Sequence, residues 1–283
     1  MTGTLATSSA ASPDGCHGQL AASDARCDDA GRRGSFRRAR SKLERHADIW
    51  HDRPLTRDIY RGYHQAIARE RSRVDGVDLE VGSGHGSFSQ FAPRTVSCDI
   101  VPCGWLDCAA DATRLPFRSA SLSNIIMIDV LHHIADPSAF FHEAERTLAP
   151  GGRILLIEPY VSPVSWIAWR FFWEEPMNTK VCPLAGDVSG RRVETDDPWD
   201  ANVAIPTLLF WRRPETFRAR FPALSVIRRR RFDLLLYPLS GGFERRRFVP
   251  LPLVPVVRAC ERLLTPLAPL LAFRCSVVIE KVR

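Results

Sequence analysis

The sequence predicts a doubly wound α/β sheet with a ligand site at the carboxyl end of its first strand. Residues 77–81 are rich in branched apolar side chains, which favours a buried parallel strand. The strand leads into glycines at every second position, Gly82, Gly84 and Gly86. Glycine allows a sharp turn and a close approach of the backbone to a ligand. Residues 87–91 can then open a helix whose N–H groups face the same crevice, and this strand–turn–helix unit is typical of such sheets.

The spacing of the glycines separates two classes of nucleotide-like ligand. In the dinucleotide fingerprint G-x-G-x-x-G/A, the third glycine position would fall on Ser87, whereas the sequence reads G-x-G-x-G. An acid, Glu80, lies two positions before the first glycine. The next expected strand, residues 95–99, ends in Asp99, whose carboxylate can accept hydrogen bonds from both hydroxyls of a ribose. An NAD(P)-dependent Rossmann oxidoreductase is therefore the alternative rather than the first choice.

Four motifs, in order, resemble those of class I S-adenosylmethionine (SAM)-dependent methyltransferases of the type 11 group, which act on quinones, sterols, sugars and natural products. They are Glu-Val-Gly-Ser-Gly-His-Gly at 80–86, Asp-Ala-Thr-Arg-Leu-Pro-Phe at 111–117, Ile-Asp-Val-Leu-His-His-Ile at 128–134, and Leu-Ala-Pro-Gly-Gly at 148–152 followed by Glu-Pro at 158–159. One departure is Ser123-Asn124, where the group usually has Phe-Asp. The resemblance implies a Rossmann-like sheet of seven strands, the last antiparallel, and SAM as cofactor.

The resemblance also implies which residues hold the cofactor. Asp99 would bind the ribose, and Asp111 with Ala112 would hold the adenine, whose exocyclic amine would donate to the Asp111 carboxylate. The residues expected to contact SAM are Glu80, Gly82, Ser83, Gly84, Gly86, Asp99, Ile100, Asp111, Ala112 and Asp129.

Catalysis of methyl transfer needs little beyond alignment, because the methyl group of SAM is already activated on a sulfonium. Orientation alone contributes about 7–11 kcal/mol to such reactions. A hydroxyl acceptor must also lose a proton, and the candidate bases are His133 and Glu158, with His132 beside them. A purely structural role for these side chains stays open, and with it a SAM-binding protein without catalysis. No metal site is expected, because the adjacent histidines should point in different directions.

Composition and charge restrict the class of partner. The chain has 283 residues and a net charge of +7, but only three lysines, so its positive charge is arginine and is not read as a nucleic-acid surface. The motifs of DNA methyltransferases are absent after the expected fourth strand. The eight cysteines form no C-x-x-C pair, and the first 30 residues lack an apolar signal segment. A cytoplasmic enzyme, with peripheral contact at the inner face of a membrane, is expected.

The expected organisation has three parts. Residues 1–34 are low in aromatic side chains and are expected to be a disordered tail. Residues 35–73 are expected to form a helical lid, interrupted at Pro54, and residues 74–283 the methyltransferase domain. From the lid, His51, Tyr60 and His64 are candidates to face the site.

Two later segments are candidates for the acceptor side. The insert at about 160–205 is rich in tryptophan and carries Trp199, Asp200 and Asn202, which could bind an acceptor with an apolar body and a hydroxyl. The segment at about 249–273 is apolar, broken by prolines and preceded by arginines, a combination that can dock on an anionic bilayer. Ordinary packing remains the alternative for both. The expected reaction is O-methylation of a small-molecule, lipid or glycan acceptor.

Overall fold

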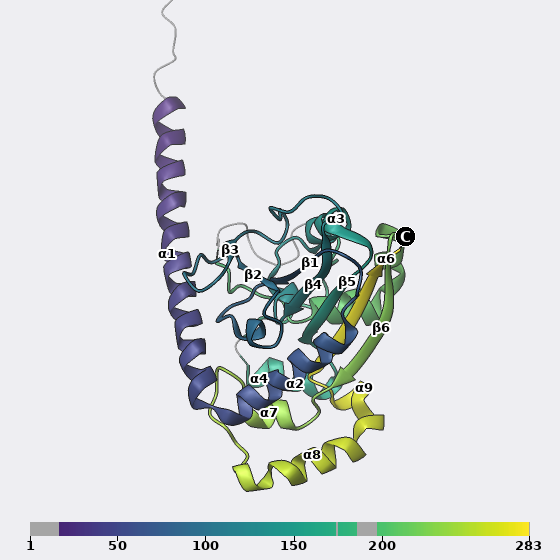
Figure 1. The fold of residues 1–283 in the computed structure, drawn as a ribbon. Coiled ribbons are helices and arrows are strands. Elements are labelled where there is room, and N and C mark those ends of the chain that lie inside the picture. The colour runs from purple at the N-terminus through teal and green to yellow at the C-terminus, as the bar shows by residue number, and fades with distance from the viewer. Residues whose placement is uncertain (1–16, 174, 186–196, 283) are drawn as a thin grey trace, which may run out of the picture.

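The central feature of the protein is one seven-stranded sheet, seen in a computed structural model that describes residues 17–173, 175–185 and 197–282. The strand order is β3-β2-β1-β4-β5-β7-β6, with β1 to β5 mutually parallel and β7 antiparallel to both of its neighbours (Figure 1). The strands are β1 (Val77–Val81), β2 (Val96–Asp99), β3 (Cys108–Ala109), β4 (Leu122–Ile128), β5 (Leu148–Pro159), β6 (Leu224–Phe232) and β7 (Arg274–Lys281). The predicted Rossmann-like sheet with an antiparallel last strand is confirmed.

Helices cover both faces of the sheet and extend past one of its ends (Figure 1). They are α1 (His17–Asp52), α2 (Pro54–Glu70), α3 (Pro137–Thr147), α4 (Pro163–Phe171), α5 (Ile205–Thr207), α6 (Pro214–Arg220), α7 (Leu236–Ser240), α8 (Val254–Leu263) and α9 (Ala268–Leu271). Shorter turns of helix are η1 (Ser87–Gln90), η2 (Leu131–His133), η3 (Leu208–Arg212), η4 (Leu251–Leu253) and η5 (Thr265–Leu267).

The N-terminal segment differs from the expectation of a disordered tail. From residue 17 onward the chain is helical, so the second half of that segment belongs to α1. Residues 1–16 lie outside the described part of the chain. The helix ends at Asp52 and a new one begins at Pro54, as predicted, because proline lacks the N–H that would continue the first helix.

Two apolar cores hold the helices on the sheet. On one face, Phe140 and Phe141 of α3 are fully buried against β1, β4 and β5. Asp136 begins this helix by accepting a hydrogen bond from the Ala139 N–H at 3.0 Å, and Pro137 follows, which is the expected start signal. On the other face α2 packs, with Ile59 among its buried side chains. Both faces of β4 are therefore dry, which explains its unbroken apolar run.

The unusual pair Ser123-Asn124 lies at the end of the sheet opposite the ligand edge. Asn124 is fully buried; its amide donates to Asp78 at 2.6 Å, and its oxygen accepts from the Ser72 N–H at 2.8 Å. The pair therefore joins β4 to β1 and to the end of α2. Its departure from the group pattern leaves the carboxyl ends of the strands untouched.

The apolar segment after residue 248 runs as a string of short helices along one edge of the molecule. Figure 1 shows α8 at the outer edge, below α7 and α2. In the described residues, no helix is long and apolar enough to cross a membrane.

Candidate active site

The carboxyl ends of β1, β2 and β4 open into a cavity of about 700 Å³. Its wall includes the glycine turn, the ends of these strands and η2. α1 and α2 close it from the side, since Leu43, Tyr60 and His64 all line it, whereas His51 is exposed and does not. A cavity of this size lies within the range for small-molecule and cofactor sites.

The glycine turn adopts backbone angles that disfavour other residues. Gly82, Gly84 and Gly86 have φ of 66°, 54° and 75°. A Cβ on Gly82 would lie 2.4 Å from a Val130 methyl, so this glycine is needed for packing inside the protein. A Cβ on Gly84 would meet nothing closer than Leu43 at 3.6 Å, which leaves the space beside its backbone open to the cavity. The helix predicted after the turn is a single helical turn, η1, which ends before Phe91.

Asp99 lies beside the glycine turn, as predicted. One carboxylate oxygen accepts the Gly84 N–H and the other the Val101 N–H, each at 3.0 Å. A carboxylate has about four acceptor positions, so Asp99, which lines the cavity, keeps capacity to accept a further hydrogen bond from there. This capacity fits a hydroxyl of a ribose. The residues present therefore fit SAM at this point.

Glu80 is buried at the end of β1 and lines the cavity. Burial raises its pKa to about 8, with Asp99 adding to the shift, so the carboxyl is largely protonated at neutral pH. Ser83 lines the cavity too, but its hydroxyl donates to the Glu80 carbonyl and accepts the Cys98 N–H. The Ser83 side chain thereby joins β1 to β2 and supports the turn from behind.

The residues expected to hold an adenine lie together at the neighbouring edge. Ile100 is exposed by 38% and lines the cavity with Asp111 and Ala112. Asp111 accepts from the N–H and the hydroxyl of Thr113, at 2.8 and 2.7 Å, which fixes the carboxylate in a tight turn. Trp105, which sequence reasoning missed, donates its indole N–H to the Gly84 carbonyl at 2.9 Å.

Asp129, which is half-buried, forms an ion pair with a buried arginine that the sequence did not predict. It lies at the end of β4 with φ of 60°, a strained angle for a non-glycine residue. Both of its oxygens accept from the guanidinium of Arg274, the first residue of β7, and one also accepts from the Tyr60 hydroxyl at 2.7 Å. Burial would raise the pKa of Asp129, but Arg274 outweighs it and holds the pKa below its ordinary value. The expected contact of Asp129 with SAM stays a prediction. Most of the hydrogen bonds that its carboxylate can accept already come from Arg274 and Tyr60.

Arg274 is the centre of a wider buried network in the floor of the cavity. Its guanidinium lies 4.5 Å from the ring centre of Tyr237 and 5.4 Å from that of Tyr63. The Tyr63 hydroxyl bonds to Asp233, whose pKa burial raises to about 7. Nothing in the sequence marks Arg274 among the chain's many arginines. Only strand order brings the start of β7 to the end of β4.

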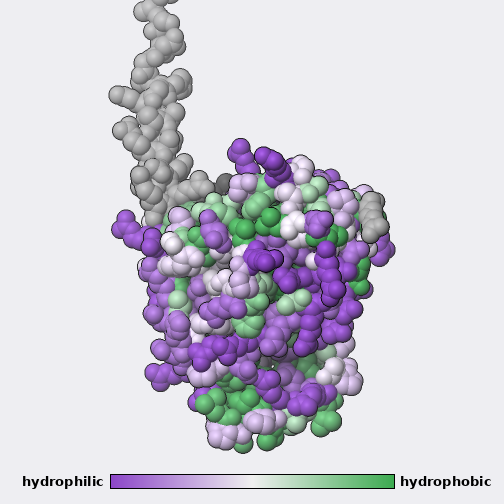
Figure 2. Space-filling model, in the orientation of Figure 1, coloured by the Kyte–Doolittle hydropathy of each residue, from purple (hydrophilic) through white to green (hydrophobic). Residues whose placement is uncertain are grey.

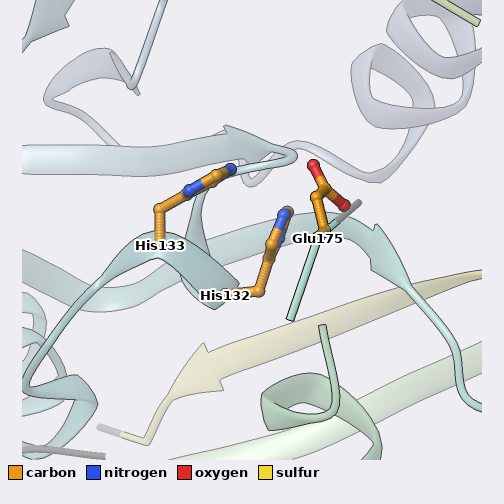
Figure 3. Close-up of side chains that lie close together, drawn as sticks. All are labelled: His132, His133 and Glu175. Atoms are coloured by element: carbon orange, nitrogen blue, oxygen red, sulfur yellow. The ribbon is translucent and has the colours of Figure 1, made fainter. Parts of the chain in front are cut away.

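The two histidines of η2 do not point apart, so that expectation is wrong. Their ring centres are 4.2 Å apart, and both rings face Glu175 across the cavity (Figure 3). Each ring is held from behind: Nδ1 of His132 bonds to Glu158 at 2.6 Å, and Nδ1 of His133 donates to the Asp200 carbonyl at 3.0 Å.

Glu158 is placed behind the site rather than in it. The side chain is fully buried, and its second oxygen accepts the N–H groups of Val130 and Leu131 at 2.9 and 2.7 Å. It is absent from the cavity wall. Its carboxylate raises the pKa of His132 above the ordinary value, although burial acts in the opposite direction. This position favours Glu158 as a positioning residue for His132 over the predicted direct base.

The three residues expected to bind the acceptor have different positions. Trp199 lines the cavity, with its ring 5.8 Å from that of His133 and the Lys42 ammonium 3.9 Å above it. Asp200 contributes its backbone carbonyl to His133. Asn202 is buried, and its amide bonds to the backbone of Asn178 on both sides, so it shapes the loop instead of the cavity wall.

Ion pairs connect α1 to the loop after α7, on the other side of the cavity. Glu244 accepts from Lys42 at 3.1 Å and pairs with His46 at 3.3 Å, both on α1. The hydrogen bond to His46 and the charge of Lys42 lower the pKa of Glu244 to about 2. Trp199 packs under the same helix. α1 thus closes over the cavity through contacts at two points.

Part of the chain is similar to known methyltransferases. Residues 79–156 match the protein-family model described as "Methyltransferase domain". Demethylmenaquinone methyltransferase of Streptomyces avermitilis is 28% identical over 127 residues, 41% of this chain and 54% of that protein. Its counterpart in Deinococcus radiodurans is 28% identical over 202 residues, 62% of this chain and 81% of that protein. The match thus spans about half the length of the first relative.

Among solved structures, a SAM-dependent methyltransferase from Archaeoglobus fulgidus is similar with a TM-score of 0.48. It is 12% identical, and the match covers 80% of this chain and 94% of that one.

Proposed function

We propose that this chain, which carries a class I SAM-dependent methyltransferase domain of the type 11 group, methylates an oxygen atom of a small, largely apolar acceptor. Its cofactor is SAM, which supplies an activated methyl group when bound. The turn at Gly82–Gly86 and the carboxylate of Asp99 would hold and orient the cofactor. Asp111 and Ala112 would hold its adenine end.

The acceptor side of the same cavity carries this proposal. Beyond the glycine turn, the wall is formed by aromatic rings around a small polar group of His132, His133 and Glu175 (Figure 3). The rings are those of Trp169, Trp173, Trp199, Tyr237 and Phe243. An apolar surface with a few convergent polar groups suits a ligand that has a greasy body and one reactive hydroxyl.

His133 is the side chain best placed to take the hydroxyl proton. A backbone carbonyl can only accept, so Nδ1 of His133 must carry a proton to donate to Asp200. In the neutral ring Nε2 then has the lone pair. A base whose ring is oriented by a hydrogen bond on its far nitrogen matches the usual arrangement for general-base catalysis.

The relatives narrow the chemical class of the acceptor. Three are named for action on demethylmenaquinone, a quinone. A reduced quinone presents a hydroxyl on a flat aromatic body, which fits the aromatic wall and the polar group. We therefore place hydroxylated aromatic compounds of the quinol type first among acceptors.

The test is a turnover screen with product analysis. Purified protein is incubated with SAM carrying a deuterated methyl group and with reduced quinones, matched quinones and a glycan-lipid extract. We expect S-adenosylhomocysteine to form with a hydroxylated aromatic compound, and the label to be on oxygen. His133→Ala should lower kcat by about 100-fold or more, the range for loss of a general base. The matched control is His142→Ala, an exposed histidine on α3. Label on carbon would overturn O-methylation, and no turnover with any acceptor would overturn catalysis.

We also propose that the enzyme meets its acceptor at an anionic membrane surface. Large apolar side chains are exposed along η4 to α9: Phe248, Leu251, Leu253, Val256, Leu263, Leu267 and Leu270. Figure 2 shows hydrophobic residues gathered at the end of the molecule where Figure 1 places α8. Arg246, Arg247 and Arg262 are exposed beside them. Exposed apolar side chains next to cations are the features that bind an interface.

Contacts on the inner side of α8 leave this outer face uncovered. Glu261 accepts the N–H groups of Leu235 and Leu236 at 3.0 and 3.5 Å, and Arg258 pairs with Asp58 at 2.5 Å. The preceding loop, which includes Arg245, lines the cavity. A lipid-soluble acceptor could thus pass from the surface to the site along one segment.

Vesicle flotation tests the membrane proposal. The protein should float with vesicles that contain anionic lipid at low salt, and less with neutral vesicles. Leu263→Asp with Val256→Asp should abolish flotation, whereas Ile227→Asp, an exposed apolar position on β6, should not. Equal flotation of both variants, or none by the unaltered chain, would contradict a membrane role.

A further inference from the structure

Three potential metal ligands converge on the acceptor side of the cavity. One ligand atom from each of His132, His133 and Glu175 lies within 4.8 Å of the others (Figure 3). All three residues line the cavity, with His132 buried and the other two half-buried. Two imidazoles and a carboxylate form a common donor set for first-row transition metals.

The histidine rings are held as metal ligands are usually held. Nδ1 of His132 is committed to the buried carboxylate of Glu158, and Nδ1 of His133 to the carbonyl of Asp200. Metal-binding histidines characteristically donate their other N–H to a carboxylate or backbone carbonyl, which fixes tautomer and ring direction. The same nitrogen, Nε2, is therefore the ligand atom that each ring would offer.

The donor set also selects the kind of ion. Mg²⁺ and Ca²⁺ prefer all-oxygen sites, whereas imidazole suits Zn²⁺, Co²⁺ and similar ions. Three protein ligands leave one position of a tetrahedral ion open, as in catalytic zinc sites. Bonds of about 2.1 Å would bring the ligand atoms to about 3.4 Å apart, so ion binding would draw the three side chains together from their present separation of at most 4.8 Å.

We propose that His132, His133 and Glu175 bind a divalent transition-metal ion whose open position faces the cavity and takes the hydroxyl oxygen of the acceptor. This inference rests on the proposed function for the identity of that oxygen. A bound ion lowers the pKa of an oxygen that it coordinates, so the hydroxyl proton passes to water. In this form His133 is a ligand and the metal replaces it as the activating group.

The test measures metal binding without activity. Protein freed of metal by a chelator is titrated with Co²⁺ and followed by visible absorption, and Zn²⁺ stoichiometry is measured by equilibrium dialysis. We expect one ion per chain, with the absorption of a four- or five-coordinate nitrogen–oxygen site. His133→Ala and Glu175→Gln should weaken binding by more than 100-fold. Glu158→Gln, behind the ligand, should weaken it by about 10–100-fold.

Matched controls separate this site from others on the chain. His142→Ala, on the exposed face of α3, should bind Co²⁺ like the unaltered protein. Glu175 is half-buried and outside the strands, so Glu175→Gln tests the site even where a histidine variant fails to fold. A sulfur-to-cobalt charge-transfer band would place the ion on a cysteine such as Cys182 and overturn the proposal. Equal affinity in the Glu175 variant, or no binding, would also overturn it.

The failure of this proposal and of the proposed function can be told apart. One Co²⁺ per chain, lost in Glu175→Gln, supports the site even when no acceptor is methylated, which would overturn only the function. Methyl transfer at an unchanged rate after chelation would overturn the metal's part in activation and leave His133 as the base.

Discussion

The cavity wall has a cofactor half, proposed to hold SAM and formed by residues 80–113, and an acceptor half, in which residues 128–136 meet segments from both ends of the chain. In the cofactor half, the Gly84 N–H of the glycine turn donates to the carboxylate of Asp99 at the end of the neighbouring strand. In the acceptor half, His133 meets Asp200 and Trp199, and Asp129 meets Arg274. The first half is thus fixed by local sequence and the second by side-chain pairing across the fold. The two halves should respond differently to substitution.

The largest effect is expected in the acceptor half at Arg274. Arg274→Ala would leave the half-buried Asp129 without its counter-charge and remove a buried side chain, which should cost about 3 kcal/mol of unfolding free energy, the lower end of the range for breaking a buried ion pair. Urea denaturation measures it. Arg228→Ala is the control, because Arg228 pairs with Glu70 at the surface and is half exposed, and such pairs contribute about 0–1 kcal/mol. Equal losses at the two arginines would mean that the buried network does not stabilise the fold.

Gly82 tests whether the glycine turn serves the ligand or the protein. Gly82→Ala would drive a methyl group into Val130 at a φ of 66°, and overpacking of this kind costs about 1–3 kcal/mol. Gly84→Ala meets no such neighbour, so its main effect should be weaker binding of S-adenosylhomocysteine in calorimetry. Adding Val130→Ala should restore stability to the Gly82 variant alone. No rescue would show that backbone strain, not packing, is responsible.

Substitution of Asp99 tests whether the cofactor half binds SAM independently of the acceptor half. Asp99→Ala removes a charged acceptor and should weaken S-adenosylhomocysteine by about 1.5–3 kcal/mol, with little change in acceptor binding. Asp111→Ala should also weaken the cofactor, through the adenine amine. Calorimetry checks both. Unchanged affinity in the Asp99 variant would exclude the ribose assignment.

The smallest effect is a pH dependence of stability from Glu80. Its folded pKa of about 8 lies above the ordinary value of 4.5, so the folded state binds more protons and stability falls as pH rises between these values. Burial lowers the pKa values of His64 and His85 to about 3 and 4, so they add stability as pH rises toward 6.5.

The unfolded histidines are half protonated at pH 6.5, so their contributions are complete only near pH 7.5, where Asp233, with a pKa of about 7, is also mostly ionised. Above that pH Glu80 should dominate, with a slope of about 1 kcal/mol per pH unit or less. Denaturation of the ligand-free protein between about pH 7.5 and 8.5 measures this slope, and Glu80→Gln should remove most of it. A slope that persists in the variant would assign the effect to another group.

Local sequence patterns were sufficient to predict those parts of the fold that depend on residues close together in the chain. The run 77–86 predicted a buried strand and a glycine turn, because alternation of glycine has few other uses, and the structure has both. Asp136-Pro137 predicted the start of α3, because an aspartate that caps the helix and a proline in the first turn are a local start signal. The seven-stranded sheet with an antiparallel last strand followed from the resemblance of four motifs, whereas the order of the strands is known from the structure.

Tertiary structure decided everything that depends on residues far apart in the chain. Arg274 looks like any other arginine until β7 inserts beside β5 and brings it to Asp129. The sequence predicted that the adjacent histidines point apart. In the structure Glu158 holds one ring and the Asp200 carbonyl holds the other, and neither contact can be read from the sequence. Sequence by itself predicted the sheet and the cofactor edge, where hydrogen-bonded residues such as Gly84, Asp99 and Trp105 lie within 21 positions of one another. The folded chain determined the acceptor side, because burial and charge there are set by partners far apart in the chain, such as Asp129 and Arg274, which are 145 positions apart, and Tyr63 and Asp233, which are 170 apart.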